Sequence, residues 1–272
     1  MKKSNYTHFH KDVKQYGIDY AIQHTLNAGF EAVEVFDNPG FSRWLSDNES
    51  FLHLQEKLIS SKLDVSCFSA LTNLLADNVG EIMENLHGLI ELAAKLGSPY
   101  FHHTLVPELK FFDDEPTFES VFERVADNAE KIALWCNQNN LVCLYEPQGK
   151  YFNGINNLKF LIDEMRKRGR IVGVCGDTGN SMFVDCAPDK LFEFFKDDVK
   201  HIHLKDYKIV DTPQGKFYKI INGKYLIPAP VGLGNANVKA CLQCLGDYSG
   251  YFSIESEETD EEIRKLEDII GI

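Results

Sequence analysis

The sequence predicts a single (β/α)8 (TIM) barrel domain over residues 1–272, and three observations support this prediction. Short, β-rich apolar runs alternate with longer amphipathic segments along the chain, which is typical of parallel strands covered by helices. Eight such pairs follow one another, and no linker, low-complexity tract or change of composition divides them. The length of 272 residues also suits one barrel, which usually takes about 250 residues.

The predicted elements follow from residue types and apolar spacing. Each strand is a run rich in β-branched and aromatic residues, and each helix repeats apolar residues at intervals of three and four. The predicted strands cover 5–10, 31–37, 63–71, 99–106, 141–147, 171–177, 199–206 and 251–256, of which the first has the weakest pattern. The predicted helices cover 19–29, 41–62, 78–97, 118–140, 156–169, 187–197, 237–247 and 259–271. A longer connection separates the seventh strand from its helix.

Composition and charge narrow the possible partners. The formal net charge of −13 disfavours nucleic acids and anionic membrane surfaces, which both require a basic face. No apolar run approaches the roughly 20 residues of a membrane span, and the start, MKKSNYTHFHKDVK, has no apolar core of a signal peptide. Seven irregularly spaced cysteines indicate reduced thiols, so we expect a cytoplasmic protein.

Four of the predicted strands end in residue types that can bind a metal ion. In a (β/α)8 barrel, function lies at the carboxyl ends of the strands. The fifth strand ends in Glu146, the sixth in Asp177, the seventh in His203 and the eighth in Glu255. Neighbouring strands are about 4.8 Å apart, so four adjacent strands on a curved wall can direct these side chains at one point.

Three carboxylates and one imidazole in one pocket would repel each other without a cation. Three oxygen ligands and one nitrogen ligand suit one divalent ion, with Mn²⁺ as the favoured ion and Mg²⁺, Co²⁺ or Zn²⁺ as alternatives. His203 would be the nitrogen ligand. His201, one pleat deeper on the same face, would be a polar core residue or a partner of the ligands.

Five short motifs carry a resemblance to a known family. In order, they are YEP (145–147), GDTGN (176–180), HIHLKD (201–206), GLGN (232–235) and SIE (253–255). Their order, spacing and placement on the predicted strands resemble those of the xylose isomerase-like barrels, which include sugar phosphate isomerases and epimerases. The resemblance extends over residues 19–258.

The resemblance implies a function and a set of roles. Glu146, Asp177, His203 and Glu255 would bind one divalent metal. Glu146 and Glu255 would also act as the catalytic acid/base pair, which moves a proton on a small sugar or sugar phosphate through an enediolate. Relatives of this family are often dimers or tetramers, so a homo-oligomer is expected as well.

Other positions are expected to contact the substrate. Asn180 stands where the epimerase branch of the family usually has a histidine, and it can bind a hydroxyl group but cannot titrate. Lys205 could bind a substrate oxygen or phosphate as a point charge, and the GLGN turn could direct backbone N–H groups at an oxyanion. His103 could contact the substrate or lie in a loop. Glu34 could contact the substrate or cap loop amides.

Three alternative functions stay open at this point. The same site could dehydrate a polyol ketone such as an inosose, as a metal-dependent lyase. The barrel could instead be a non-catalytic sugar-binding relic. An apurinic endonuclease is disfavoured, because those enzymes need a histidine-rich cluster of zinc ions and a basic surface.

Overall fold

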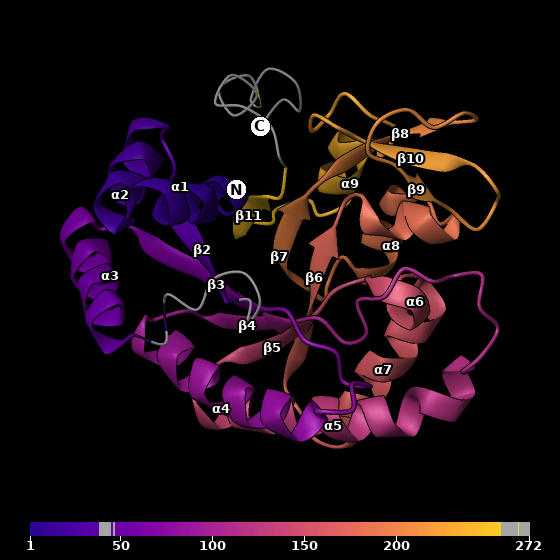
Figure 1. Cartoon of the computed structure of the whole chain (residues 1–272), viewed down its shortest axis with the longest axis horizontal. Coiled ribbons are helices and arrows are strands. Elements are labelled where there is room, and N and C mark those ends of the chain that lie inside the picture. The colour runs from indigo at the N-terminus through magenta and orange to yellow at the C-terminus, as the bar shows by residue number, and fades with distance from the viewer. Residues whose placement is uncertain (38–44, 46, 257–265, 267–272) are drawn as a thin grey trace.

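The computed structural model describes residues 1–37, 45, 47–256 and 266. Eight parallel strands close into one barrel, which confirms the predicted (β/α)8 architecture (Figure 1). The first strand closes the ring by pairing with the second strand and with the last. Around the ring the strands are β1 (Lys2–Asn5), β2 (Ala32–Asp37), β3 (Asp64–Ala70), β4 (Tyr100–His103), β5 (Val142–Tyr145), β6 (Val172–Asp177), β7 (Val199–Leu204) and β11 (Tyr251–Ile254).

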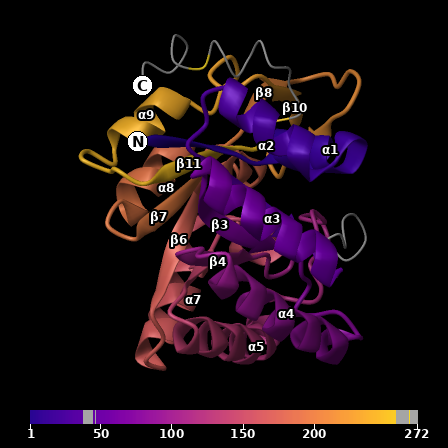
Figure 2. The ribbon, with the colours of Figure 1, turned by 90° about the vertical axis from the view of Figure 1, so that its left-hand side faces the viewer.

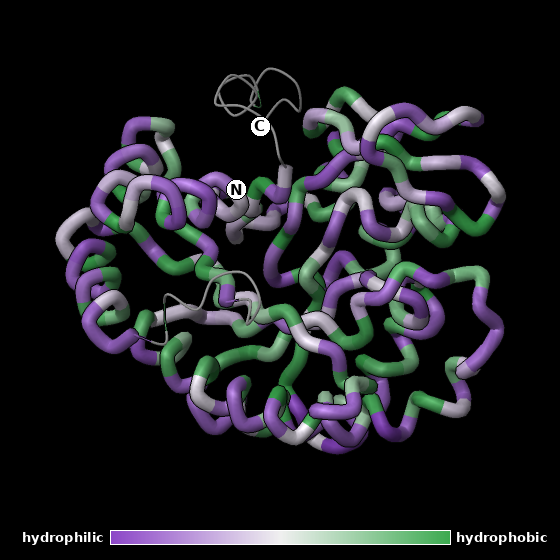
Figure 3. The backbone as a smooth tube through the Cα atoms, in the orientation of Figure 1, coloured by the Kyte–Doolittle hydropathy of each residue, from purple (hydrophilic) through white to green (hydrophobic). Residues whose placement is uncertain are grey.

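Amphipathic helices cover the outside of this barrel. Figure 3 shows hydrophilic and hydrophobic residues alternating along them, because one face of each helix packs on the strands and the other meets solvent. Polar side chains cap some of them, as at α3, where Asp47 accepts hydrogen bonds from the N–H groups of Glu49 and Ser50. The helices are α1 (Thr7–Tyr16), α2 (Ile18–Asn27), α3 (Asn48–Ser61), α4 (Val79–Lys95), α5 (Phe118–Gln138), α6 (Gly149–Phe152), α7 (Ile155–Lys167), α8 (Pro188–Phe195) and α9 (Val238–Gln243), with a 3₁₀ helix over Asn180–Val184.

Two predicted elements differ from the structure. The first strand was expected over 5–10, but residues from Thr7 onward form α1, because Phe9 and Val13 lie four residues apart and both pack inward. The barrel strand is instead the short segment before it. The connection after β7 is an antiparallel sheet of β8 (Asp206–Val210), β9 (Tyr218–Lys219) and β10 (Tyr225–Ala229).

This small sheet lies at one end of the barrel. It continues directly from β7, and it lies at the top in both Figure 1 and Figure 2. The predicted helix over 259–271, apart from residue 266, and residues 41–44 and 46 of the helix predicted over 41–62 lie outside the described residues. Among the residues that the structure describes, no helix is long and apolar enough to cross a membrane.

The core has two layers. The larger layer lies between the strands and the helices. A smaller layer inside the barrel consists of Cys67, Leu144 and Cys175, all fully buried. Leu144 and Cys175 each lie two residues before a predicted ligand, so these side chains close the barrel one pleat below Glu146 and Asp177.

Candidate metal centre

The four predicted ligands lie together at the carboxyl ends of the strands. One ligand atom from each of Glu146, Asp177, His203 and Glu255 lies within 4.8 Å of the others. Asp177 ends β6, His203 is on β7, and the two glutamates follow β5 and β11 directly. The first three side chains are buried, and the side chain of Glu255 is 28% exposed.

Hydrogen bonds hold the ring of His203 in one orientation. Its Nε2 lies 2.9 Å and 3.1 Å from the two carboxylate oxygens of Glu34, so Nε2 carries the proton and donates it. The opposite nitrogen, Nδ1, faces the cluster, 3.1 Å from Glu146 Oε1 and 3.4 Å from Glu255 Oε2. The ring of Tyr6 stacks on the imidazole at 5.2 Å.

Glu34 is a fully buried carboxylate that holds two imidazoles. Besides His203, it accepts a hydrogen bond from His201 Nε2 at 2.8 Å, and His201 Nε2 also lies 3.0 Å from Ser253 Oγ. Burial acts to raise the pKa of Glu34, but His203 and His201 hold it well below its usual value. His201 therefore lies deep in the barrel, as predicted. Among the described residues, the Glu34 carboxylate contacts Ser69, His201 and His203, so it orients His203.

Asp177 presents one oxygen without a hydrogen-bond partner. Its Oδ1 accepts the backbone N–H groups of Gly179 at 2.7 Å and Asn180 at 2.6 Å. Its buried Oδ2 has no hydrogen-bond partner among the described residues, and the Nζ of Lys205 lies 3.5 Å away. Burial raises the pKa of Asp177 to about 7.

These features fit a divalent cation. A lone pair on His203 Nδ1 facing two carboxylates is repulsive unless a proton or a metal ion lies between them. Asp177 Oδ2, which has no hydrogen-bond partner among the described residues, supplies another donor atom. The bond from His203 to Glu34 is the carboxylate–histidine arrangement that supports metal-binding histidines. Three oxygen donors and one nitrogen donor suit Mn²⁺, Mg²⁺ or Zn²⁺.

Lys205 and Asn180 lie beside the cluster and contact its carboxylates. The Nζ of Lys205 is 2.7 Å from Glu255 Oε1 and 3.3 Å from Asn180 Oδ1. Asn180 Nδ2 in turn donates to Glu146 Oε1 at 3.2 Å. Although burial acts to raise the pKa of Glu255, Lys205 keeps it below its usual value.

On β4, the structure brings His102 rather than His103 into the cluster. The Nε2 of His102 lies 3.4 Å from Glu146 Oε2, and its Nδ1 lies 3.0 Å from Ser69 Oγ. His103 donates from Nδ1 to the carbonyl of Thr104 at 3.0 Å and packs edge-on against Tyr145. His102 pairs with Leu144 on β5, and only this register, which the sequence does not reveal, selects His102 over His103. No sequence pattern identified Tyr6.

The glycine turn after β10 binds a carboxylate of the chain itself. Asp206 accepts the backbone N–H groups of Gly232 at 3.0 Å, Gly234 at 2.8 Å and Ala236 at 2.9 Å. A Cβ atom at Gly234 would lie 2.2 Å from Asp206 Oδ1, so only glycine fits there. The predicted oxyanion contact of this turn is therefore occupied by Asp206, whose role in the HIHLKD motif is structural.

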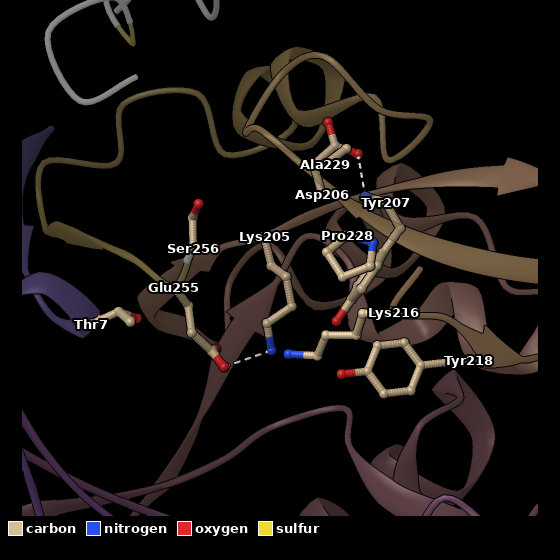
Figure 4. Close-up of a pocket in the computed structure, with 10 residues that line it drawn as sticks. All are labelled: Thr7, Lys205, Asp206, Tyr207, Lys216, Tyr218, Pro228, Ala229, Glu255 and Ser256. Carbon is tan, nitrogen blue, oxygen red and sulfur yellow. Dashed lines mark hydrogen bonds and ion pairs between the residues drawn. The ribbon is translucent and has the colours of Figure 1, made fainter. Parts of the chain in front are cut away.

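A pocket of about 280 Å³ opens beside the cluster, between β7 and the small sheet (Figure 4). Glu255 and Lys205 form its inner wall. The small sheet and the loop before β9 contribute Tyr207, Tyr218 and Lys216. The cluster of candidate ligands thus borders a pocket large enough for a small molecule.

Comparison with known proteins supports this architecture. The sequence matches the xylose isomerase-like TIM barrel family over residues 22–269. An inosose dehydratase of Bacillus cereus is 24% identical over 159 residues, which are 56% of this chain and 52% of the relative. The chain therefore spans about half the length of the curated relatives that it matches.

Several solved structures share the fold. The probable 3-DHS dehydratase AsbF from Bacillus anthracis superposes with a TM-score of 0.76 at 15% identity, covering 100% of this chain and 99% of that one. The IOLI protein with a bound zinc atom superposes with a TM-score of 0.74 at 15% identity, covering 100% of this chain and 98% of that one. A D-tagatose 3-epimerase-like protein superposes with a TM-score of 0.73 at 15% identity, covering 100% of this chain and 96% of that one. At these identities the likeness concerns the fold alone.

Proposed function

Because the chain belongs to the xylose isomerase-like TIM barrel family, we propose that it is a divalent-metal-dependent isomerase or epimerase of a small sugar or sugar phosphate. The observation that carries this proposal is the position of two carboxylates about one point. Glu146 Oε1 and Glu255 Oε2 lie 3.1 Å and 3.4 Å from the same nitrogen, His203 Nδ1. Glu146, Asp177, His203 and Glu255 would hold the ion, with Mn²⁺ as the favoured metal.

The two glutamates come from different strands, so they can act on opposite faces of a bound substrate. One carboxylate takes the proton from the carbon between a carbonyl and a hydroxyl group, and the other returns a proton to the opposite face or to the neighbouring carbon. A divalent ion in the cluster would polarise the carbonyl and stabilise the negative charge of the enediolate. Asn180 and Lys205 would hold the substrate's hydroxyl groups.

A second candidate function is dehydration of a polyol ketone, and Lys205 favours it. Its ammonium group lies 2.7 Å from Glu255 and 3.5 Å from Asp177, inside the site. In this reaction a glutamate takes the proton beside the carbonyl, and the carbon–oxygen bond of the β-hydroxyl breaks. The departing hydroxide takes a proton from Lys205 and leaves as water. Three of the similar proteins bear names of dehydratases.

The proposal extends to the setting of the reaction. All seven cysteines are free thiols, in keeping with a reducing cytoplasm. We expect the chain to act as a homo-oligomer on a small molecule. Light scattering after size-exclusion chromatography measures the oligomeric state.

An exchange experiment tests the chemistry and separates the two candidates. The metal-loaded protein is incubated in D₂O with ketoses, aldoses, their phosphates and inosose-type ketones, and each sample is followed by NMR. Deuterium beside a carbonyl together with a new epimer or isomer supports the proposal, whereas loss of water identifies a lyase. Silence across the panel with metal bound would contradict both.

Variants test the roles of the two carboxylates. Glu146→Gln and Glu255→Gln should each lower kcat by about 10²- to 10⁴-fold on the substrate found, because each removes an acid/base group. Glu91→Gln, on the exposed face of α4, is the matched control and should leave turnover unchanged. Full turnover by either site variant would contradict the assignment.

A further inference from the structure

We infer that His102 is a positioning residue for Glu146, one of the two carboxylates to which the proposed function gives the acid/base role. His102 holds the Oε2 atom of this carboxylate, so that Oε1 stays turned toward the cluster. The contacts that support this role lie within the chain itself, and its effect on turnover rests on the proposed function.

The two oxygens of Glu146 have separate partners. Oε1 lies 3.1 Å from His203 Nδ1 and accepts a hydrogen bond from Asn180 Nδ2 at 3.2 Å. Oε2 lies 3.4 Å from His102 Nε2, and the side chains of His102 and Glu146 are only 5% and 2% exposed. A buried carboxylate oxygen without a polar partner is costly, so the imidazole stabilises Oε2 on this side of the site.

The ring of His102 is itself fixed from the opposite side. Ser69 is its register partner on β3, and Ser69 Oγ lies 3.0 Å from His102 Nδ1. The hydroxyl group of Ser69 has one proton, which it donates to Glu34 Oε1 at 2.5 Å. Ser69 Oγ therefore accepts the Nδ1–H of His102, and this bond keeps Nε2 directed at Glu146.

These contacts close a ring of side chains. Glu34 binds the Nε2 of His203, and the Nδ1 of His203 faces Glu146, so the path returns to its start. Two buried carboxylates are thus linked by one histidine on one side and by a histidine and a serine on the other. The members in order are Glu146, His102, Ser69, Glu34 and His203.

Loss of the His102 imidazole should displace Glu146 and leave the rest of the ring in place. In His102→Leu, Oε2 faces a hydrocarbon side chain, so the carboxylate turns to bring both oxygens to its remaining donors. An acid/base group must lie close to the proton that it moves, and a displacement of about 1 Å can cost about 100-fold in rate. The bond between Glu34 and His203 does not depend on His102 and should persist.

Crystal structures of the chelator-treated parent, His102→Leu and His102→Gln test this role without metal or turnover. Glutamine can place an N–H group where the histidine has Nε2, so it serves as the conservative variant. We expect Glu146 Oε1 to keep its hydrogen bond to Asn180 in the parent and in His102→Gln, and to lose it in His102→Leu. An unmoved Glu146 carboxylate in His102→Leu would overturn the inference.

Kinetics with the substrate found by the exchange experiment test the consequence for turnover. His102→Leu should lower kcat by about 10- to 100-fold with little change in KM, and His102→Gln should recover most of the loss. His87→Leu, on the exposed face of α4, makes the same change away from the site and should leave kcat unchanged. Equal values of kcat for His102→Leu and the parent, or for His102→Leu and His102→Gln, would also overturn the inference.

The two measurements separate this inference from the proposed function. If the parent shows no exchange on any substrate, the proposed function fails, and the position of Glu146 in the crystals still decides whether His102 holds it. If the parent shows exchange while Glu146 stays in place in His102→Leu, the metal-dependent chemistry stands and the positioning role of His102 is wrong.

Discussion

The buried carboxylate of Glu34 determines which nitrogen of His203 faces the cluster, so replacing it by an amide should weaken metal binding. Glu34 accepts hydrogen bonds from His201 Nε2 at 2.8 Å and from His203 Nε2 at 2.9 Å. Glutamine offers one oxygen and one NH₂ group at the same place. One of the two imidazoles in Glu34→Gln must therefore face a donor and move its own proton to Nδ1.

The two ways of meeting this conflict have different consequences. If the proton of His203 moves to Nδ1, this Nδ1–H can donate to Glu146, 3.1 Å away, but Nδ1 can no longer bind a metal. If the proton of His201 moves to Nδ1 instead, this Nδ1–H is buried and finds no hydrogen-bond partner among the described residues. The metal-free variant adopts the first arrangement, and metal binding forces the second.

The magnitude follows from that forced change. Burying an unpartnered N–H group costs about 1–3 kcal/mol, and each 1.4 kcal/mol is about a factor of ten in affinity. Glu34→Gln should therefore bind Mn²⁺ about 10- to 100-fold more weakly than the parent, the range observed when carboxylate partners of metal-binding histidines are removed.

Calorimetric titration of chelator-treated protein with Mn²⁺ measures this loss. Glu91→Gln serves as the control and should bind within about twofold of the parent, which is well below the 10-fold minimum expected for Glu34→Gln. Circular dichroism confirms that each variant is folded. If Glu34→Gln also binds within twofold of the parent while His203→Ala loses the ion, the orientation argument is wrong.

Two further predictions concern the carboxylates near the cluster. Burial raises the pKa of Asp177 to about 7, so the metal-free parent loses stability as pH rises from about 4 through 7. Asp177→Asn removes this loss. In urea unfolding with chelator, the free energy of unfolding of the variant relative to that of the parent should rise by at least about 1 kcal/mol from pH 4 to pH 8. If the free energies of unfolding of variant and parent differ equally at pH 4 and at pH 8, the burial argument is wrong. Asp206→Ala leaves the turn's N–H groups without their acceptor and should lower the free energy of unfolding by about 2–4 kcal/mol, with Mn²⁺ affinity unchanged by calorimetry. Loss of Mn²⁺ binding by the folded variant would place Asp206 among the metal-binding residues.

Much of the fold could be predicted because buried parallel strands and amphipathic helices leave regular patterns in the sequence. The strands ending at Asp177 and near His203 were identified by apolar runs that stop in polar residues. The first strand was misplaced because Lys2–Asn5 has too few apolar residues to signal a strand, and only pairing with β2 and β11 holds it in the barrel. The small sheet was missed because its strands are short and partly exposed.

Within the site, inward alternation along the strands predicted the four residues that the structure brings together. It did not predict which of His102 and His103 faces inward, since that depends on the register of β4 beside β5. It also did not reveal that Glu34 bonds both His201 and His203, because those partners are 167 and 169 residues away in the chain. Such contacts depend on closure of the barrel, which no local pattern encodes.

The central claim is that Glu146, Asp177, His203 and Glu255 hold one divalent ion. Anomalous diffraction from crystals grown with Mn²⁺ tests it most directly. The account predicts one strong anomalous peak between these four side chains, with His203 bound through Nδ1 and Nε2 still donating to Glu34. A peak elsewhere, or no peak at a saturating concentration of Mn²⁺, would contradict it.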